Sequence, residues 1–341
     1  MSTNQGKSYR IPEPRIKAFA PPTYHCRRAG ESFTLDGDLN KSVWQRAPWT
    51  ADFRDIEGDG KPTPRFRTRA KMLWDDGALY VGAELEGSEI WGTVTKRDET
   101  IFVDNDFELF IDPDSDTHVY AEFEMNVLNT LWDLLLTKPY RDGGRAVSSY
   151  DIKGLEAAVL VDGNINDPTA DNRKWSVEVK IPFKSLFECV GQGSVPKLGD
   201  FWRMNFSRVQ WLVDVVDGKY AKRINGATGQ PFPEDNWVWA PTGLINIHYP
   251  ELWGFVFFCR GDEEYTIPPD EFLKWKLRRL YYALHAVFDE TGVFAQDALR
   301  GTVEAAGVSI QTTDYGFTLS CPATDGKGRL VMYTDGRITY I

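Results

Sequence analysis

Two neighbouring runs of alternating polar and apolar residues constrain the fold more than any other part of the chain. In residues 104–111, Asp106 and Glu108 fall on one side of an extended strand and the apolar residues fall on the other, because strand side chains repeat every two residues. Residues 122–127 alternate in the same way. The residues between the two runs, with the sequence PDSD, favour a tight turn. Residues 101–132 are therefore predicted to form an antiparallel hairpin.

The polar face of this predicted hairpin carries a high density of hydrogen-bond acceptors. Carboxylates directly opposite each other destabilise a sheet unless a cation, a basic residue or the hydroxyl groups of a ligand offset their charge. The alternative is a solvated sheet face that simply carries charge. We expect a polar partner on this face, whose members are Asp106, Glu108, Glu122, Glu124 and Asn126.

Charge and composition limit the partners that the chain can have. With 341 residues the chain is longer than a typical single domain, and its net charge of −11 repels nucleic acid and anionic membranes, so neither is expected as a partner. The sequence has no apolar run of about 18 residues or more and no apolar signal segment at its start. We expect a cytoplasmic protein, or a secreted or periplasmic one if a signal has been removed.

The remaining pattern indicates a β-rich domain with a different C-terminal part. Residues 67–85 read as a second hairpin around the turn Asp75, Asp76 and Gly77. We predict a mainly β fold, in which an arm at 1–23 precedes an antiparallel β-sandwich at 24–260. Further strands are expected at residues 33–35, 155–162, 175–181, 201–209 and 253–259.

Residues 261–341 are predicted to form a small α+β appendage. Apolar residues repeat there with a period near 3.6, Asp270 is a candidate N-cap, and three short strands follow at 316–320, 330–333 and 337–341. The helical stripe must dock, either on the sandwich or on a second copy of the chain, which makes an oligomer possible. Its residues are Phe272, Trp275, Leu280, Leu284 and Phe288.

Asp112, Asp114 and Asp116 have the alternating spacing of a calcium-binding loop with oxygen ligands. The glycine and the distant glutamate of an EF-hand loop are missing, and a plain turn explains the spacing equally well. A structural calcium ion is therefore one of two interpretations of this loop, and the sequence suggests no other cofactor. The four cysteines form no CxxC pair and so indicate no zinc site and no disulfide framework.

The ordered motifs resemble those of family 9 carbohydrate-binding modules and their free-standing relatives over roughly residues 24–258. They are LDG, WDDGALYVGAEL, DNDFELFIDPD, EFEMN, WSVEVKIPF, WRMNFSR and WAPTG. The resemblance implies a β-sandwich that binds a terminal sugar between two aromatic rings. It also implies that carboxylate, amide and guanidinium groups bind the sugar hydroxyls, with structural calcium nearby.

The resemblance carries over to individual residues of this chain. It implies one ring at Phe102 or Trp91 and an acidic ligand at Glu108, and the facing ring is expected at Trp237, ahead of the other candidates, Trp211 and Trp239. The chain departs from the family in its long loops at 138–150 and 212–236 and in its appendage. The full predicted ligand set is Trp91, Phe102, Asp106, Glu108, Glu124, Asn126, Arg203, Asn205 and Trp237.

We therefore predict carbohydrate binding on the polar sheet face, because a sugar needs aromatic platforms for its C–H face and planar polar groups for its hydroxyls. The first alternative is a glycoside hydrolase or lyase that uses Glu108 and Glu124 as its paired carboxylates. The second is a non-catalytic scaffold or oligomer subunit.

Overall fold

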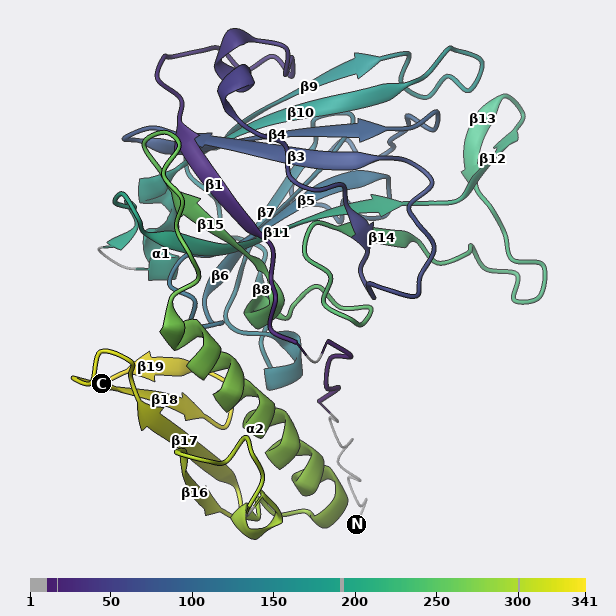
Figure 1. Cartoon of the computed structure of the whole chain (residues 1–341). Helices are drawn as coiled ribbons and strands as arrows, with labels where there is room; N and C mark the ends of the chain where they lie inside the picture. Colours follow the sequence, from purple (N-terminus) through teal and green to yellow (C-terminus); the bar gives the residue numbers. More distant parts are fainter. Residues whose placement is uncertain (1–10, 17, 191–192, 300) are drawn as a thin grey trace.

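The computed structural model describes residues 11–16, 18–190, 193–299 and 301–341. It has a large β-sandwich, with the appendage as a separate lobe beside it (Figure 1). Within the described ranges, none of the helices has the length and apolar character needed to cross a bilayer.

One hydrogen-bonded path of strands forms both layers of the sandwich, in the order β8-β7-β6-β5-β11-β15-β1-β3-β4-β10-β9. The first layer contains β5 (Asp106–Asp112), β6 (Tyr120–Asn126), β7 (Leu131–Leu136), β8 (Ala146–Val147), β11 (Phe201–Gln210) and β15 (Gly254–Phe258), with β14 (Asp235–Val238) and β2 (Arg54–Asp55) beside β11. The second contains β3 (Thr68–Trp74), β4 (Ala78–Glu86), β9 (Glu156–Asp162) and β10 (Lys174–Pro182).

Strand β1 (Thr23–Arg28) joins the two layers. Its first residues pair with β15 and its last two with β3, and both pairings are parallel. The predicted mainly β sandwich is confirmed, but it is not antiparallel throughout. The alternation in β5 directs its apolar side chains into the core between the layers. Phe107 and Leu109 point toward the second layer and pack in one cluster with Val81 and Val179.

Residues 33–35 do not form the predicted strand. They lead instead into a turn whose amide groups at Asp36 and Gly37 donate to the buried carboxylate of Glu178, both at 2.8 Å. The short helix η1 (Ser42–Arg46) then places the indole N–H of Trp44 on the other oxygen of Glu178, at 2.6 Å. A buried carboxylate on β10 therefore holds this segment.

The appendage consists of α2 (Pro269–Thr291) against a sheet of β16 (Ser309–Thr313), β17 (Gly316–Pro322), β18 (Arg329–Tyr333) and β19 (Ile338–Tyr340). Strand β16 was not predicted. Pro268, not Asp270, is the N-cap of α2, and Asp270 accepts the N–H of Thr324 instead. The remaining short elements are η2 (Tyr140–Asp142), η3 (Phe183–Leu186), α1 (Phe187–Val190), β12 (Val213–Val216), β13 (Lys219–Lys222), η5 (Pro250–Leu252) and η6 (Gln296–Leu299).

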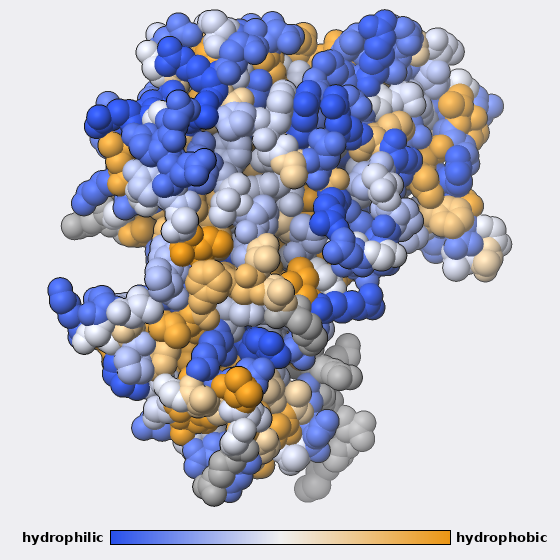
Figure 2. All heavy atoms as spheres, viewed as in Figure 1, coloured by the Kyte–Doolittle hydropathy of each residue, from blue (hydrophilic) through white to orange (hydrophobic). Residues whose placement is uncertain are grey.

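The appendage docks on the sandwich of the same chain. Of the predicted helical stripe, Trp275, Leu280 and Leu284 are buried, whereas Phe272 stays half exposed. Phe19, from the segment before β1, stacks on Trp275 with ring centroids 5.6 Å apart. Apolar residues gather at this junction on the face shown in Figure 2. The apolar stripe is therefore mostly covered within the chain.

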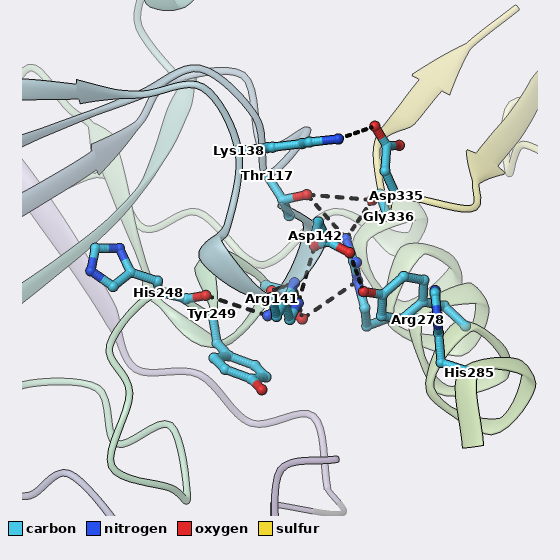
Figure 3. A network of polar contacts seen from close by, with 12 residues as sticks. Thr117, Lys138, Arg141, Asp142, His248, Tyr249, Arg278, His285, Asp335 and Gly336 are labelled. Carbon is cyan, nitrogen blue, oxygen red and sulfur yellow. Dashed lines mark hydrogen bonds and ion pairs between the residues drawn. The ribbon is translucent and has the colours of Figure 1, made fainter. Parts of the chain in front are cut away.

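A buried polar network crosses the same junction (Figure 3). Arg141 of η2 contacts Glu251 of η5 at 2.9 Å, and Arg278 of α2 lies 3.5 Å from the same carboxylate. The hydroxyl of Tyr282 also donates to Glu251. Burial opposes ionisation of Glu251, but the two guanidinium groups outweigh it and lower the pKa of Glu251 to about 2.

Candidate functional site

The candidate site is a group of four carboxylates on the outer side of the first layer, which we call the acidic face: Asp106, Glu108, Glu122 and Glu124. The hairpin of β5 and β6 forms as predicted, with Glu108 paired directly with Glu124 and Asp106 with Asn126. All four side chains are buried, Asp106 completely and Glu108 to all but 7%. The alternative of a solvated, charged sheet face is therefore wrong.

The carboxylates of the acidic face lie very close together. One oxygen from each of Asp106, Glu108 and Glu124 lies within 4.8 Å of the other two. Asp106 Oδ1 accepts the N–H of Val209 at 3.2 Å, but Asp106 Oδ2 is buried without a hydrogen-bond partner, as is Glu122 Oε2. In the described part of the chain no lysine, arginine or histidine forms an ion pair with any of the four.

Burial raises the pKa of every carboxylate on the acidic face, because the charged form loses its hydration. The pKa of Glu108 rises to about 7, with Glu234 of the 212–236 loop adding to the effect of burial. For Asp106 and Glu124, burial is the largest cause of the raised pKa, and the neighbouring charge of Glu108 is the next largest. The surroundings of the acidic face therefore disfavour the charged form of all four carboxylates.

Aromatic rings border the acidic face. Phe102 is 41% exposed, its N–H donates to Glu124 Oε2 at 3.2 Å, and its ring centroid lies 6.5 Å from that of Trp132. Trp132 is paired with Glu124 across β6 and β7. Trp211 donates its indole N–H to the carbonyl of Phe102 at 3.0 Å. Tyr140 is 44% exposed, and its partial burial and then the charges of Glu122 and Glu124 raise its pKa to about 12.

Sequence reasoning missed Trp132 and Tyr140. Continuing the strand pairing from β6 into β7 would have placed Trp132 opposite Glu124. Tyr140 lies in the loop at 138–150, which the sequence analysis marked only as an unusually long loop, and no local pattern distinguishes its ring from that of any other loop tyrosine.

Three of the predicted ligand residues have their polar groups engaged elsewhere. Arg203 is buried, donates to the carbonyls of Glu251 and Trp253, and lies 3.4 Å from Glu271 of α2. It therefore helps to hold the appendage. Asn205 exchanges hydrogen bonds with the backbone of Ala240, both at 2.9 Å.

The side chain of Asn126 is likewise fully hydrogen-bonded within the protein. Its NH2 group donates to the carbonyl of Val94 and to Asp104, and its oxygen accepts two backbone N–H groups. The predicted facing ring, Trp237, is 3% exposed and lies in the core, and the guanidinium groups of Arg65 and Arg208 are each 5.2 Å from its ring centroid. Trp91 is also buried. Of the other ring candidates Trp239 is buried and Trp211 is partly buried, so Phe102 is the most exposed of the predicted rings.

The aspartates of the expected calcium loop lie at the other end of β5, next to the appendage. One oxygen from each of Asp112, Asp114 and Asp116 lies within 4.8 Å of the other two. Asp112 accepts the N–H groups of Ser115 and Thr117 at 3.1 and 3.0 Å. Burial and the two neighbouring aspartates raise the pKa of Asp112.

The family model for carbohydrate family 9 binding domain-like proteins matches residues 35–199 of this chain. This match covers β5, β6 and thus the whole acidic face, and it confirms the resemblance over that region. No curated protein sequence is similar enough to this chain to count as a relative.

The solved structures that are similar to this chain have low sequence identity. A family 9 carbohydrate-binding module from Caldicellulosiruptor kristjanssonii, in complex with cellotriose, is 15% identical, with 72% of this chain and 98% of that chain covered and a TM-score of 0.44. A putative carbohydrate-binding protein from Bacteroides uniformis is also 15% identical, with 70% and 97% covered and a TM-score of 0.47.

Proposed function

Because residues 35–199 match a carbohydrate family 9 binding domain-like model, we propose that this protein binds a carbohydrate at the acidic face. The sugar stacks on Phe102 and hydrogen-bonds to Glu108 and Glu124. A sugar ring has an apolar face of C–H groups and a rim of hydroxyl donors, and a carboxylate can accept two of those donors at once. An aromatic ring, Phe102, and two carboxylates, Glu108 and Glu124, are the groups that would supply these two kinds of contact.

The observation that carries the proposal is the position of Phe102. Its ring is 41% exposed although it stands next to a buried charged cluster, and its backbone N–H is fixed to Glu124 at 3.2 Å. A large exposed ring has no folding advantage there, whereas a ligand that covers the ring gains buried apolar area. The neighbouring ring of Trp132 extends the platform.

The test is calorimetric titration with glucose, cellotriose and xylo-oligosaccharides. Phe102→Ala is expected to weaken binding about tenfold, and Phe102→Trp to retain it. Phe187→Ala is the matched control, because Phe187 is also an exposed ring but lies on α1. Equal affinity in the wild type and Phe102→Ala, or no binding to any sugar in a broad panel, would remove the proposal.

A glycoside hydrolase or lyase at the same face is the second candidate. Retaining glycosidases place their two carboxyl groups about 5–5.5 Å apart and need one of them protonated near neutral pH. Oxygens of Glu108 and Glu124 lie within 4.8 Å of each other, and the pKa of Glu108 is raised to about 7 by burial. Product formation from the same sugars, lost in both Glu108→Gln and Glu124→Gln, would establish catalysis, and binding without products would exclude it for those sugars.

Calcium at Asp112, Asp114 and Asp116 is part of the same proposal. The residues fit the ion in supplying three close carboxylates, although Asp116 already lies 3.2 Å from the guanidinium of Arg337. Asp114, which is exposed, is the member to change. Asp114→Asn is expected to reduce the calcium-dependent rise in Tm, with magnesium as the control ion.

A further inference from the structure

We propose that Asp106, Glu108 and Glu124 hold a divalent metal ion at the base of the acidic face. This site is distinct from the loop of Asp112, because Asp106 and Asp112 are the first and last residues of β5. It does not depend on carbohydrate binding, since the ion is recognised by the three carboxylates alone.

The geometry of the three carboxylates suits an ion. Calcium binds oxygen at about 2.3–2.6 Å, so ligands on opposite sides of the ion lie roughly 4.6–5.2 Å apart and neighbouring ligands lie closer. Oxygens of Asp106, Glu108 and Glu124 lie within 4.8 Å of one another, which is close to the spacing of ligands around a single ion. The strand pairing fixes this arrangement, because Glu108 and Glu124 are direct partners and Asp106 is two residues from Glu108 on the same face.

A second, independent observation is the unpartnered oxygen of Asp106. Asp106 is fully buried, and its Oδ1 accepts the N–H of Val209, but its Oδ2 has no hydrogen-bond partner. Buried polar atoms are nearly always satisfied, since an unsatisfied one loses its hydration without replacement. An ion between the three carboxylates gives this oxygen its missing partner.

Two basic residues on the strands that follow in the chain have their charged groups engaged elsewhere. Arg203 is bound to the carbonyl of Trp253 and to Glu271, and Lys222 stands over the ring of Trp211 at 3.2 Å from its centroid. Within the described residues, none of the three carboxylates takes part in an ion pair of 4.0 Å or less. Among the described residues no basic side chain therefore compensates these carboxylates, and a bound cation would supply the missing positive charge.

The ligand set indicates the kind of ion. All the ligands are carboxylate oxygens, without the histidine or cysteine that zinc and copper prefer. Magnesium usually keeps several of its waters, whereas calcium accepts a cage of protein oxygens with flexible geometry. Calcium is therefore the expected ion.

The experiment titrates calcium chloride into protein that has been stripped with EDTA, without any sugar. Asp106→Asn is expected to lower the calcium stoichiometry by one, or to weaken that binding event at least tenfold, and Glu124→Gln to do the same. Glu122→Gln is the matched control: it removes a buried carboxylate of the same face that is not one of the three ligands, and it is expected to keep the full stoichiometry. Asp114→Asn is expected to affect only the other site.

A structural role for Asp106 predicts a different pattern. If Asp106 only accepts the Val209 N–H, its asparagine variant keeps that acceptor, binds calcium as the wild type does and shows the same rise in Tm with calcium. That result overturns the proposal, as does a wild-type protein that binds no calcium beyond what Asp114→Asn removes. Near-ultraviolet circular dichroism of the stripped variants confirms that they are folded. Phe102→Ala keeps the calcium site in either case, so failure of the carbohydrate proposal is measured separately.

Discussion

Glu108 and Glu124 occupy directly paired positions on β5 and β6, and both carboxylates are buried. Like charges placed opposite each other destabilise a sheet, and burial removes the water that would screen them. This pair therefore costs stability in the protein without ligand or ion, and that cost is the physical reason to assign a function to this face.

The first prediction is that Glu108→Gln stabilises the metal-free protein at pH 7.5. The substitution removes one charge of the pair and keeps the shape, so the free energy of unfolding should rise by about 1 kcal/mol, or Tm by about 2 °C. Thermal unfolding in EDTA measures the change. Glu290→Gln, at an exposed position near the end of α2, should leave Tm unchanged. A lower Tm for Glu108→Gln would show that the charge is already compensated.

The second prediction concerns the junction between the sandwich and the appendage. Glu251→Gln leaves buried Arg278 without its carboxylate and Arg141 with only that of Asp142, and breaking a buried ion network in this way costs about 3 kcal/mol. Lys138→Met breaks the partly exposed pair of Lys138 with Asp335 and should cost less than about 1 kcal/mol. Urea unfolding compares the two variants, and equal losses would contradict the assigned role of the network.

The third prediction is the pH dependence of the same junction. Arg141 and Arg278 outweigh the effect of burial and lower the pKa of Glu251 to about 2, against an ordinary value of 4.5. Between these values the unfolded state binds more protons, so the stability that Glu251 contributes is fully present above about pH 4.5 and is lost as the pH falls toward 2. The difference in stability between the wild type and Glu251→Gln should therefore shrink from pH 6 to pH 3. A constant difference would show that Glu251 does not titrate in this window.

The fourth prediction uses two glycines with the same backbone conformation. Gly37 and Gly60 have φ of +84° and +94°, but a Cβ at Gly37 would lie 2.4 Å from the backbone N of Leu160, whereas a Cβ at Gly60 meets nothing within 4 Å. Gly60→Ala should cost about 1 kcal/mol from backbone strain alone. Gly37→Ala should cost clearly more, because it also displaces the turn that binds Glu178. Similar losses in chemical denaturation would mean that this turn is less tightly packed than the structure shows.

The sequence by itself determined the hairpin of β5 and β6, the side of each strand that enters the core, and the grouping of Asp106, Glu108 and Glu124 on one face. These features follow from a period of two residues, which is local and needs no knowledge of the rest of the chain. Strand β16 escaped prediction because it is mostly exposed and so lacks an apolar signal.

Only the tertiary structure decided which polar and aromatic groups remain available to a ligand. Arg203 lies on the expected strand, but it forms an ion pair with Glu271 of the appendage, which is far away in sequence. Trp237 is buried in the core, where β14 pairs with both β11 and β2, whereas Phe102 stays 41% exposed. Periodicity states which way a side chain points from its strand, whereas burial depends on what the distant parts of the chain place over it.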